Sequence, residues 1–256
     1  MTSSLTTLIT GDELVGRLDD GQLFLLDVRE PDEVADWAIP GVVNIPVDSL
    51  ESRLDEVPAR RDVVVICARG ARAERGRQIL AAHGRASRVL DGGMSGWAAT
   101  YDTVAADFGQ ARVVQVRRRG KGCLSYVVGA GERCAVIDPS LEINRYQDIA
   151  SAHGWRISYI VDTHLHADHV SGARELAAAT GAALLLNPGD PFGFDYEALV
   201  DGREMELSEG INLAVSSVSV PGHTEGSTMY RLGDAAVFTG DTLFLDSVGR
   251  PDLAEQ

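Results

Sequence analysis

Four side chains that can bind a metal ion lie within six consecutive positions in the second half of the chain. They are His164, His166, Asp168 and His169. Imidazole and carboxylate groups together suit a divalent zinc or iron ion. An apolar run over Ile157 to Val161 precedes them, and a helical pattern over Gly172 to Thr180 follows them. The sequence therefore predicts a metal-binding loop at the C-terminal end of a strand, with a histidine-rich surface turn as the alternative.

Two sharp turns near the end of the chain each place another candidate ligand after a predicted strand. His223 lies in the turn Pro221 to Thr224, and Asp241 lies in the turn Thr239 to Thr242. Taken alone, His223 has an ordinary turn histidine as its alternative interpretation. Beside the ligand-rich loop, that alternative carries less weight.

Cys67 is the third candidate for chemistry. It follows the apolar run Val63 to Ile66 and begins a loop that opens onto a predicted helix. A thiol there lies among unsatisfied backbone N–H groups at the positive end of the helix, so we expect it to ionise readily. The nearby cations are Arg69, Arg72 and Arg75. A buried packing cysteine is the alternative interpretation.

The composition limits the classes of partner. The 256 residues are 45% hydrophobic and 24% charged, as in an ordinary globular protein, with a formal net charge of −15. Such acidity argues against nucleic acid or an anionic membrane surface, so a small molecule is the expected partner. Met1 to Thr10 lacks the features of a secretory signal, and we expect a cytoplasmic protein. Cys123 and Cys134 are expected to pack in strands rather than to form disulfides.

The first part of the chain has the pattern of an α/β domain. In residues 11 to 104, short apolar runs alternate with helical stretches, which favours a parallel sheet with helices on both faces. The expected strands are Leu23 to Val28, Val42 to Ile45, Val63 to Cys67 and Arg88 to Leu90, and the expected helices are Gly11 to Leu18, Asp48 to Leu54 and Ala71 to His83. Residues 101 to 110 show no clear period. We therefore expect a first domain over 6–104, a linker over 105–111 and a second domain over 112–256.

The second domain has a different pattern, in which strands follow one another before the first helix. The expected strands are Val113 to Val116, Ser125 to Val128, Ala135 to Ile137, Ile157 to Val161, Ala183 to Leu186, Leu213 to Val220 and Ala235 to Phe238. Helices are expected over Ile143 to His153 and over Gly172 to Thr180. The basic turn Arg117 to Gly122 is expected to be a solvated hairpin, and residues 188 to 210 are expected to be rich in loops.

Four motifs in the first domain resemble the rhodanese sulfurtransferase family. They are Asp27 to Glu30, Ile39 to Pro46, the Cys-x-x-Gly-x-Arg loop over residues 67–72, and Asp91 to Trp97. The family usually has Gly-His before Ile-Pro-Gly, where this chain has Trp37 and Ala38. The resemblance implies that Cys67 takes a sulfane sulfur from thiosulfate or a persulfide and passes it to an acceptor. It also implies that backbone amides around Arg69, Gly70 and Ala71 hold the anionic donor, while Arg72 orients sulfonate or sulfite oxygens.

The second domain resembles the metallo-β-lactamase superfamily. The motifs are Thr-His-x-His-x-Asp-His over residues 163–169, Gly-His over residues 222–223, and Thr-Gly-Asp over residues 239–241. The resemblance implies an α+β fold, an αββα sandwich in which two sheets lie between two helical layers. Ala167 and the stretch Gly249 to Leu253 resemble the persulfide dioxygenase branch, whereas the related glyoxalase II enzymes tend to have a bulky aromatic residue in place of Ala167. The superfamily fold also continues beyond the point where this sequence stops, so we expect a C-terminally incomplete unit.

The two branches imply different metal sites. In a dioxygenase, His164, His223 and Asp241 would bind one Fe(II), because zinc has no redox chemistry. His166, Asp168 and His169 would then lie behind these ligands and orient them. In a hydrolase, the same six residues would bind zinc, with two ions generating a hydroxide for thioester cleavage. Spacing alone does not separate the two.

The two resemblances together imply a role in sulfur metabolism. The first hypothesis is an enzyme that combines sulfur transfer through a Cys67 persulfide with metal-dependent oxidation of glutathione persulfide to sulfite. The second is a zinc thioesterase of the hydroxyacylglutathione hydrolase type with a rhodanese module. The third is a sulfur carrier with an inactive metallo-β-lactamase-like scaffold. The expected partners are small thiols, persulfides, thiosulfate or sulfite, and a homodimer is a candidate assembly.

Overall fold

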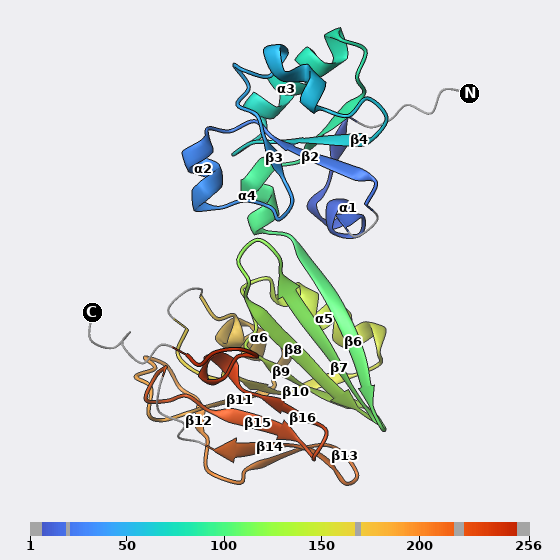
Figure 1. Ribbon diagram of the computed structural model, residues 1–256. Helices are drawn as coiled ribbons and strands as arrows, with labels where there is room; N and C mark the ends of the chain where they lie inside the picture. The colour runs from blue at the N-terminus through green and yellow to red at the C-terminus, as the bar shows by residue number, and fades with distance from the viewer. Residues whose placement is uncertain (1–6, 19–20, 167–169, 218–222, 250–256) are drawn as a thin grey trace. The chain divides into compact units, whose positions relative to one another are not determined.

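The computed structural model describes residues 7–18, 21–166, 170–217 and 223–249. The chain divides into two compact units (Figure 1). The first holds Met1–Asp102 and Arg117–Cys123, and the second holds Thr103–Val116 and Leu124–Gln256. Among the described residues, no helix has both the length and the apolar character needed to cross a membrane.

The first unit is built on a five-stranded sheet in the order β1-β5-β4-β2-β3, and every neighbouring pair is parallel. Its strands are β1 (Leu8–Ile9), β2 (Leu23–Asp27), β3 (Val43–Asn44), β4 (Asp62–Ile66) and β5 (Ser87–Leu90). Its helices are α1 (Gly11–Val15), α2 (Pro31–Asp36), the 3-10 helix η2 (Glu51–Glu56), α3 (Ala71–Ala82) and α4 (Gly93–Ala98). The α/β class and the parallel sheet expected from the sequence are confirmed.

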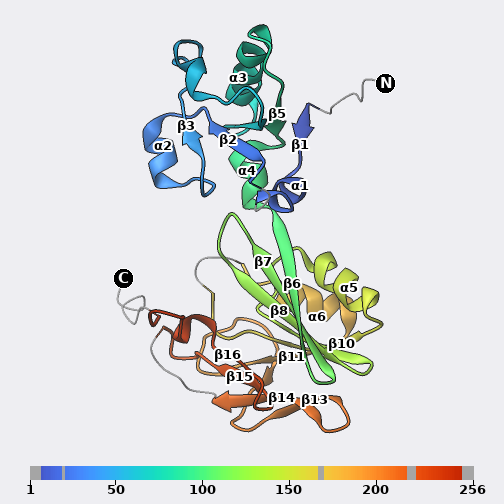
Figure 2. The ribbon, with the colours of Figure 1, turned by 45° about the vertical axis from the view of Figure 1, so that its right-hand side comes forward.

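Strand β4 shows why both faces of this sheet are covered. Val63 and Val65 belong to one buried cluster, which also contains Leu80 of α3. The alternate residue Val64 belongs to a second cluster, which contains Trp97 of α4. Since successive side chains of a strand point to opposite faces, helices must cover the sheet on both sides, and Figure 2 shows α3 and α4 on either side of it.

The second unit contains two sheets with a shared core. The larger has seven strands in the order β12-β11-β10-β9-β8-β7-β6, and the smaller has the order β13-β14-β15-β16. The strands of the larger are β6 (Tyr101–Phe108), β7 (Ala111–Arg118), β8 (Leu124–Ala130), β9 (Arg133–Ile137), β10 (Arg156–Val161), β11 (Ala183–Leu186) and β12 (Glu197–Ala198). Those of the smaller are β13 (Glu204–Ser208), β14 (Ile211–Ser217), β15 (Met229–Leu232) and β16 (Ala236–Phe238).

Alternation along the strands sorts this unit into layers. Ile137 and Val161 of the larger sheet pack with Leu213 and Tyr230 of the smaller sheet in one buried cluster. The larger sheet packs on α5 (Ile143–Ala152) and α6 (Ala173–Thr180), which contact β8, β10 and β11. The described residues of this unit therefore form helix, sheet and sheet layers, three of the four layers of the sandwich that the resemblance implies.

Several expectations about individual segments need correction. Residues 105–111, expected to be a linker, lie in β6 and its turn into β7. Residues 103–107 are exposed, so this strand carries none of the apolar alternation by which a strand is recognised. The expected helix Asp48 to Leu54 is the later 3-10 helix η2, and α2, α4 and β15 were not expected. Residues 188–210 include β12 and β13 as well as loops.

The basic turn between β7 and β8 is not simply solvated. Arg117–Cys123 belongs to the first unit. Arg118 donates from Nε to the Ala98 carbonyl at 2.8 Å, and the Lys121 ammonium lies 5.3 Å from the ring centroid of Trp37. Cation–π and hydrogen-bond contacts thus hold the turn to that unit, a tertiary effect that the local charge pattern does not encode.

Candidate functional site

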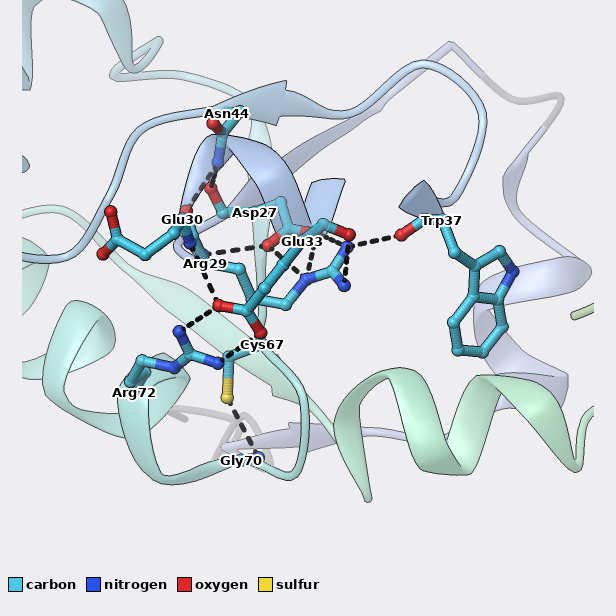
Figure 3. Close-up of polar contacts among 9 residues, drawn as sticks. All are labelled: Asp27, Arg29, Glu30, Glu33, Trp37, Asn44, Cys67, Gly70 and Arg72. Atoms are coloured by element: carbon cyan, nitrogen blue, oxygen red, sulfur yellow. Dashed lines mark hydrogen bonds and ion pairs between the residues drawn. The ribbon is translucent and has the colours of Figure 1, made fainter. Parts of the chain in front are cut away.

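Cys67 begins the loop that links β4 to α3. Its side chain is buried, and the Gly70 backbone N–H donates to Sγ at 3.0 Å. Gly70 has a φ of +110°, a conformation that favours glycine, and α3 begins at the next residue. The expected juxtaposition of the thiol with a backbone donor and a helix N-terminus is therefore present, and Figure 3 shows Sγ pointing to Gly70.

The start of α4 supports this loop from another segment of the chain. The Met94 N–H donates to the Cys67 carbonyl at 2.8 Å, and the Ser95 N–H donates to the Ala68 carbonyl at 3.2 Å. Gly93 has a φ of +56°, and a Cβ added there would lie 2.2 Å from the Cys67 carbonyl oxygen. A glycine is required because the two segments touch through their backbones. The motif Asp91 to Trp97 therefore positions the Cys67 loop.

Arg72, expected to orient donor oxygens, is held by an acidic residue that the sequence analysis did not single out. Its Nη1 and Nη2 atoms donate to the Glu33 carboxylate at 2.6 and 2.8 Å (Figure 3). The hydrogen bonds from Arg72 lower the pKa of Glu33 to about 2. Arg75 pairs with Asp48 at 2.7 Å. Within the described part of the chain, Arg69 is exposed and makes no ion pair.

A buried ion pair fixes α2, and with it Glu33. Arg29 and Asp27 have side chains that are 5% and 0% exposed, and Arg29 Nη2 donates to Asp27 Oδ2 at 2.7 Å. The same guanidinium donates to the Glu33 carbonyl at 3.1 Å and to the Trp37 carbonyl at 2.8 Å. Asn44 donates to the Asp27 and Arg29 carbonyls, each at 2.9 Å. The Asp27 to Glu30 motif thus anchors α2 beside the Cys67 loop.

His164, His223 and Asp241 come together from three separate segments of the second unit. Their ligand atoms all lie within 4.8 Å of one another. His223 Nε2 is 3.6 Å from Asp241 Oδ2, and the rings of His164 and His223 are 4.8 Å apart, edge to face. Asp241 lies in the 3-10 helix η3 (Gly240–Thr242), and His164 follows β10. Two imidazoles and one carboxylate form a suitable donor set for a transition-metal ion.

A chain of hydrogen bonds orients His164. Asp138 accepts from the Thr163 N–H at 2.6 Å and from Thr163 Oγ1 at 2.9 Å, and Thr163 Oγ1 lies 2.9 Å from His164 Nδ1. Burial, followed by the charge of the neighbouring His166, lowers the pKa of His164 to about 4. The ring is therefore neutral near neutral pH, which is the form that binds a metal.

His166 faces a different set of carboxylates. Its Nε2 lies 3.1 Å from Asp138 Oδ1, and the two residues form a second possible ligand group with Asp162. Burial raises the pKa of Asp162 to about 7, and the neighbouring Asp138 adds to the effect. A pocket of about 520 Å³ opens beside His166, with Leu165 and Phe192 in its wall. Asp168 and His169 lie outside the described residues.

Asp190 links the loops that carry two of the candidate ligands. Its buried carboxylate accepts from the Leu165 N–H at 2.8 Å and from the Gly226 N–H at 3.1 Å. Leu165 directly follows His164, and Gly226 lies in the loop that carries His223. Sequence reasoning missed Asp190 because it lies in a loop of ordinary turn residues. Asp138 had a weak signal, since it directly follows the apolar strand β9.

Both units match known protein families. Residues 10–100 match the rhodanese-like domain, and residues 118–255 match the metallo-beta-lactamase superfamily. The chain is 40% identical over 126 residues to the hydroxyacylglutathione hydrolase of Methylococcus capsulatus, covering 48% of this chain and 47% of that protein. It is 38% identical over 133 residues to that of Anaeromyxobacter dehalogenans, covering 52% and 51%. The chain thus spans about half the length of the curated relatives it matches.

Two solved structures are also similar. One is a metallo-beta-lactamase from Staphylococcus aureus, with a TM-score of 0.52 and 25% identity, covering 57% of this chain and 46% of that one. The other is ETHE1 from Myxococcus xanthus, with a TM-score of 0.46 and 25% identity, covering 60% and 62%. The family match covers more than half of this chain and includes the three clustered residues His164, His223 and Asp241. The chain therefore belongs to the metallo-β-lactamase superfamily and carries a rhodanese-like domain before its metallo-β-lactamase domain.

Proposed function

We propose that the chain is an enzyme of sulfur metabolism that oxidises a thiol persulfide to sulfite and transfers sulfane sulfur through Cys67. The observation that carries the oxidative half is the donor set formed by His164, His223 and Asp241 within 4.8 Å. Two histidines and one carboxylate are the ligands of non-haem Fe(II) oxygenases. A ferrous ion held there would supply the redox chemistry toward dioxygen that zinc lacks.

Neighbouring residues hold these ligands in place through hydrogen bonds. Neutral His164 presents a lone pair, while Asp138 and Thr163 fix its ring through hydrogen bonds at 2.6 to 2.9 Å. Asp190 holds the loops after His164 and His223 in a fixed relation. The reaction consumes one dioxygen and one water for each persulfide and releases the thiol and sulfite.

The transfer half rests on the Cys67 loop. The Cys67 thiolate attacks the outer sulfur of a persulfide, the S–S bond breaks, and its electron pair leaves with the thiol as a thiolate. The Gly70 N–H, 3.0 Å from Sγ, would stabilise the attacking Cys67 thiolate. A thiol persulfide is thus a substrate of both proposed halves, and this shared compound supports a common role of the two units in sulfur metabolism.

A zinc thioesterase is the second candidate, and the names of the relatives favour it. Proteins 34 to 40% identical over about half of their length are called hydroxyacylglutathione hydrolase. In this function, His166, Asp168 and His169 would join His164, His223 and Asp241 around one or two zinc ions. Hydrolysis of lactoylglutathione under anaerobic conditions would support this candidate.

Crossed variants test the proposed function on the full chain. Cys67→Ser should abolish sulfur transfer to cyanide while leaving oxygen uptake with glutathione persulfide unchanged. His164→Ala should abolish oxygen uptake while leaving sulfur transfer unchanged. If the wild-type protein takes up no oxygen with glutathione persulfide and hydrolyses lactoylglutathione, the oxidative proposal is wrong.

A further inference from the structure

The Glu33 carboxylate is paired with Arg72, the arginine that we expect to orient the oxygens of a sulfur donor. We propose that Glu33 is a specificity-determining residue that makes the Cys67 site favour thiol persulfides over thiosulfate. The proposal deepens the sulfur transfer proposed above and rests on it. It concerns the charge beside the sulfur atom and not the chemistry of the transfer itself.

Contacts around Cys67 carry this inference. The Glu33 carboxylate engages both terminal nitrogens of Arg72, at 2.6 and 2.8 Å. The hydrogen bonds that Arg72 donates to Glu33 are the main cause of the raised pKa of Arg72, and the charge of Cys67 adds to it, so the guanidinium lies within electrostatic reach of the sulfur. Figure 3 shows the Glu33 and Arg72 side chains together beside Cys67. Because the pair is bidentate, another oxyanion must compete with Glu33 for the two terminal nitrogens.

The position of Glu33 is built into the fold. Arg29 donates to the Glu33 carbonyl at 3.1 Å, and the Glu30 N–H donates to Glu33 Oε2 at 3.3 Å. Arg29 is in turn held by the buried carboxylate of Asp27. The carboxylate is therefore presented to Arg72 by an anchored helix, unlike a chance pair of two mobile surface chains.

The other arginines of the loop do not restore a bidentate anion site. Arg75 is paired with Asp48 at 2.7 Å. Arg69 is exposed and has no ion pair within the described residues, so it offers an attraction that solvent and salt screen strongly. Beside the sulfur, the positive charge of Arg72 is balanced by the negative charge of Glu33. A dianionic donor thus gains little from this site.

The two donors differ in the group that needs this charge. With thiosulfate, the Cys67 thiolate attacks the outer sulfur, the S–S bond breaks, and its electron pair leaves with sulfite, which carries two negative charges. With a persulfide, the same bond breaks and the electron pair leaves on a thiolate that has no sulfonate oxygens. The leaving group of thiosulfate thus carries two negative charges, whereas the thiolate carries one on its sulfur, so thiosulfate depends more strongly on the cation that is paired with Glu33.

Glu33→Gln in the full chain tests the proposal, with thiosulfate and glutathione persulfide as donors and cyanide as the acceptor. We expect kcat/KM for thiosulfate to rise by about tenfold, mainly through KM, because one negative charge is removed near a dianion. We expect the value for glutathione persulfide to stay within about twofold. Glu33→Asp, which keeps the charge, should keep the wild-type preference. An equal change for both donors, or a fall with thiosulfate alone, would overturn the proposal.

Glu74→Gln is the matched control, since Glu74 pairs with Arg77 at 2.6 Å on the same helix as Arg72. This variant also removes one carboxylate and frees one arginine, but it leaves the Glu33 pair intact. We expect its donor preference to equal that of the wild type. A shift in donor preference as large as that of Glu33→Gln would show that the effect comes from net charge, and it would contradict a specific role for Glu33.

Alkylation of Cys67 tests the effect of Glu33 on the local charge independently of the proposed sulfur transfer. The ratio of its rates with anionic iodoacetate and neutral iodoacetamide, read by peptide mass spectrometry, reports the local charge whether or not the protein transfers sulfur. We expect Glu33→Gln to raise the ratio several-fold at an unchanged iodoacetamide rate. An unchanged ratio would overturn the inference, whereas absence of transfer from both donors in the wild type would overturn the proposed sulfur transfer only.

Discussion

Replacement of Gly93 by alanine should damage the Cys67 loop more than its change in volume suggests. Two costs add. A residue with a Cβ at a φ of +56° costs about 1–2 kcal/mol. The new Cβ would also lie 2.2 Å from the Cys67 carbonyl oxygen, so the two backbones must separate. Overpacking of this kind costs about 1–3 kcal/mol, which gives an expected loss of about 2–5 kcal/mol in the unfolding free energy.

Gly84→Ala isolates the first cost. Gly84 has a φ of +69°, and a Cβ added there meets nothing within 4 Å. Its expected loss is therefore only about 1–2 kcal/mol. Urea unfolding of the full chain gives the unfolding free energy of both variants. Proteolysis at each urea concentration, with mass spectrometry of peptides from residues 10–100, reports unfolding of the first unit alone.

The two variants should also differ in activity. Separation of the backbones weakens the Met94 hydrogen bond to the Cys67 carbonyl, so Gly93→Ala should slow Cys67 alkylation or sulfur transfer by about tenfold or more. Gly84→Ala should leave both rates near those of the wild type. Equal stability and equal rates in the two variants would refute the argument that the backbone contact between Gly93 and Cys67 positions the loop.

Three further predictions concern Asp190, Glu33 and Cys134. Asp190→Ala removes a carboxylate that joins two ligand-bearing loops, so metal affinity measured by competition with a chelator should fall by about 10- to 100-fold. Because the pKa of Glu33 is lowered from 4.5 to about 2, its ion pair with Arg72 stabilises the fold above about pH 4.5 and loses this effect as the pH falls toward 2. The stability difference between wild type and Glu33→Gln should therefore shrink over that range, and it should be modest because both side chains are about one-third exposed. Burial raises the pKa of Cys134 to about 12, so iodoacetamide should leave this thiol unmodified near pH 8 in the folded protein.

Much of the fold was predictable because its strongest signals are local. The apolar runs that became β2, β4 and β11 are continuous or nearly so, and the helical pattern of α3 ends at a glycine. Edge strand β6 was missed because its exposed residues carry no alternation. Helix α2 was missed for a similar reason, since none of its residues is buried and its position is fixed by Arg29.

The residues of the candidate sites also differ in whether the sequence predicts them. His164, His223 and Asp241 were predicted from local motifs, and the structure brings their ligand atoms within 4.8 Å. The residues that hold such groups in place come from distant segments and carry no motif of their own. Asp190 lies 26 residues after His164, and Glu33 lies 39 residues before its partner Arg72. Only the tertiary fold creates these pairs, so no sequence window contains them.

The iron site proposed for His164, His223 and Asp241 can be tested directly through its chemistry. The most direct measurement reconstitutes the metal-free chain with Fe(II) or with Zn(II) and records oxygen consumed and sulfite formed from glutathione persulfide. We expect one dioxygen consumed and one sulfite formed per persulfide with iron, and neither with zinc. Hydrolysis of lactoylglutathione by the zinc form, without oxygen uptake by the iron form, would contradict the proposed iron site.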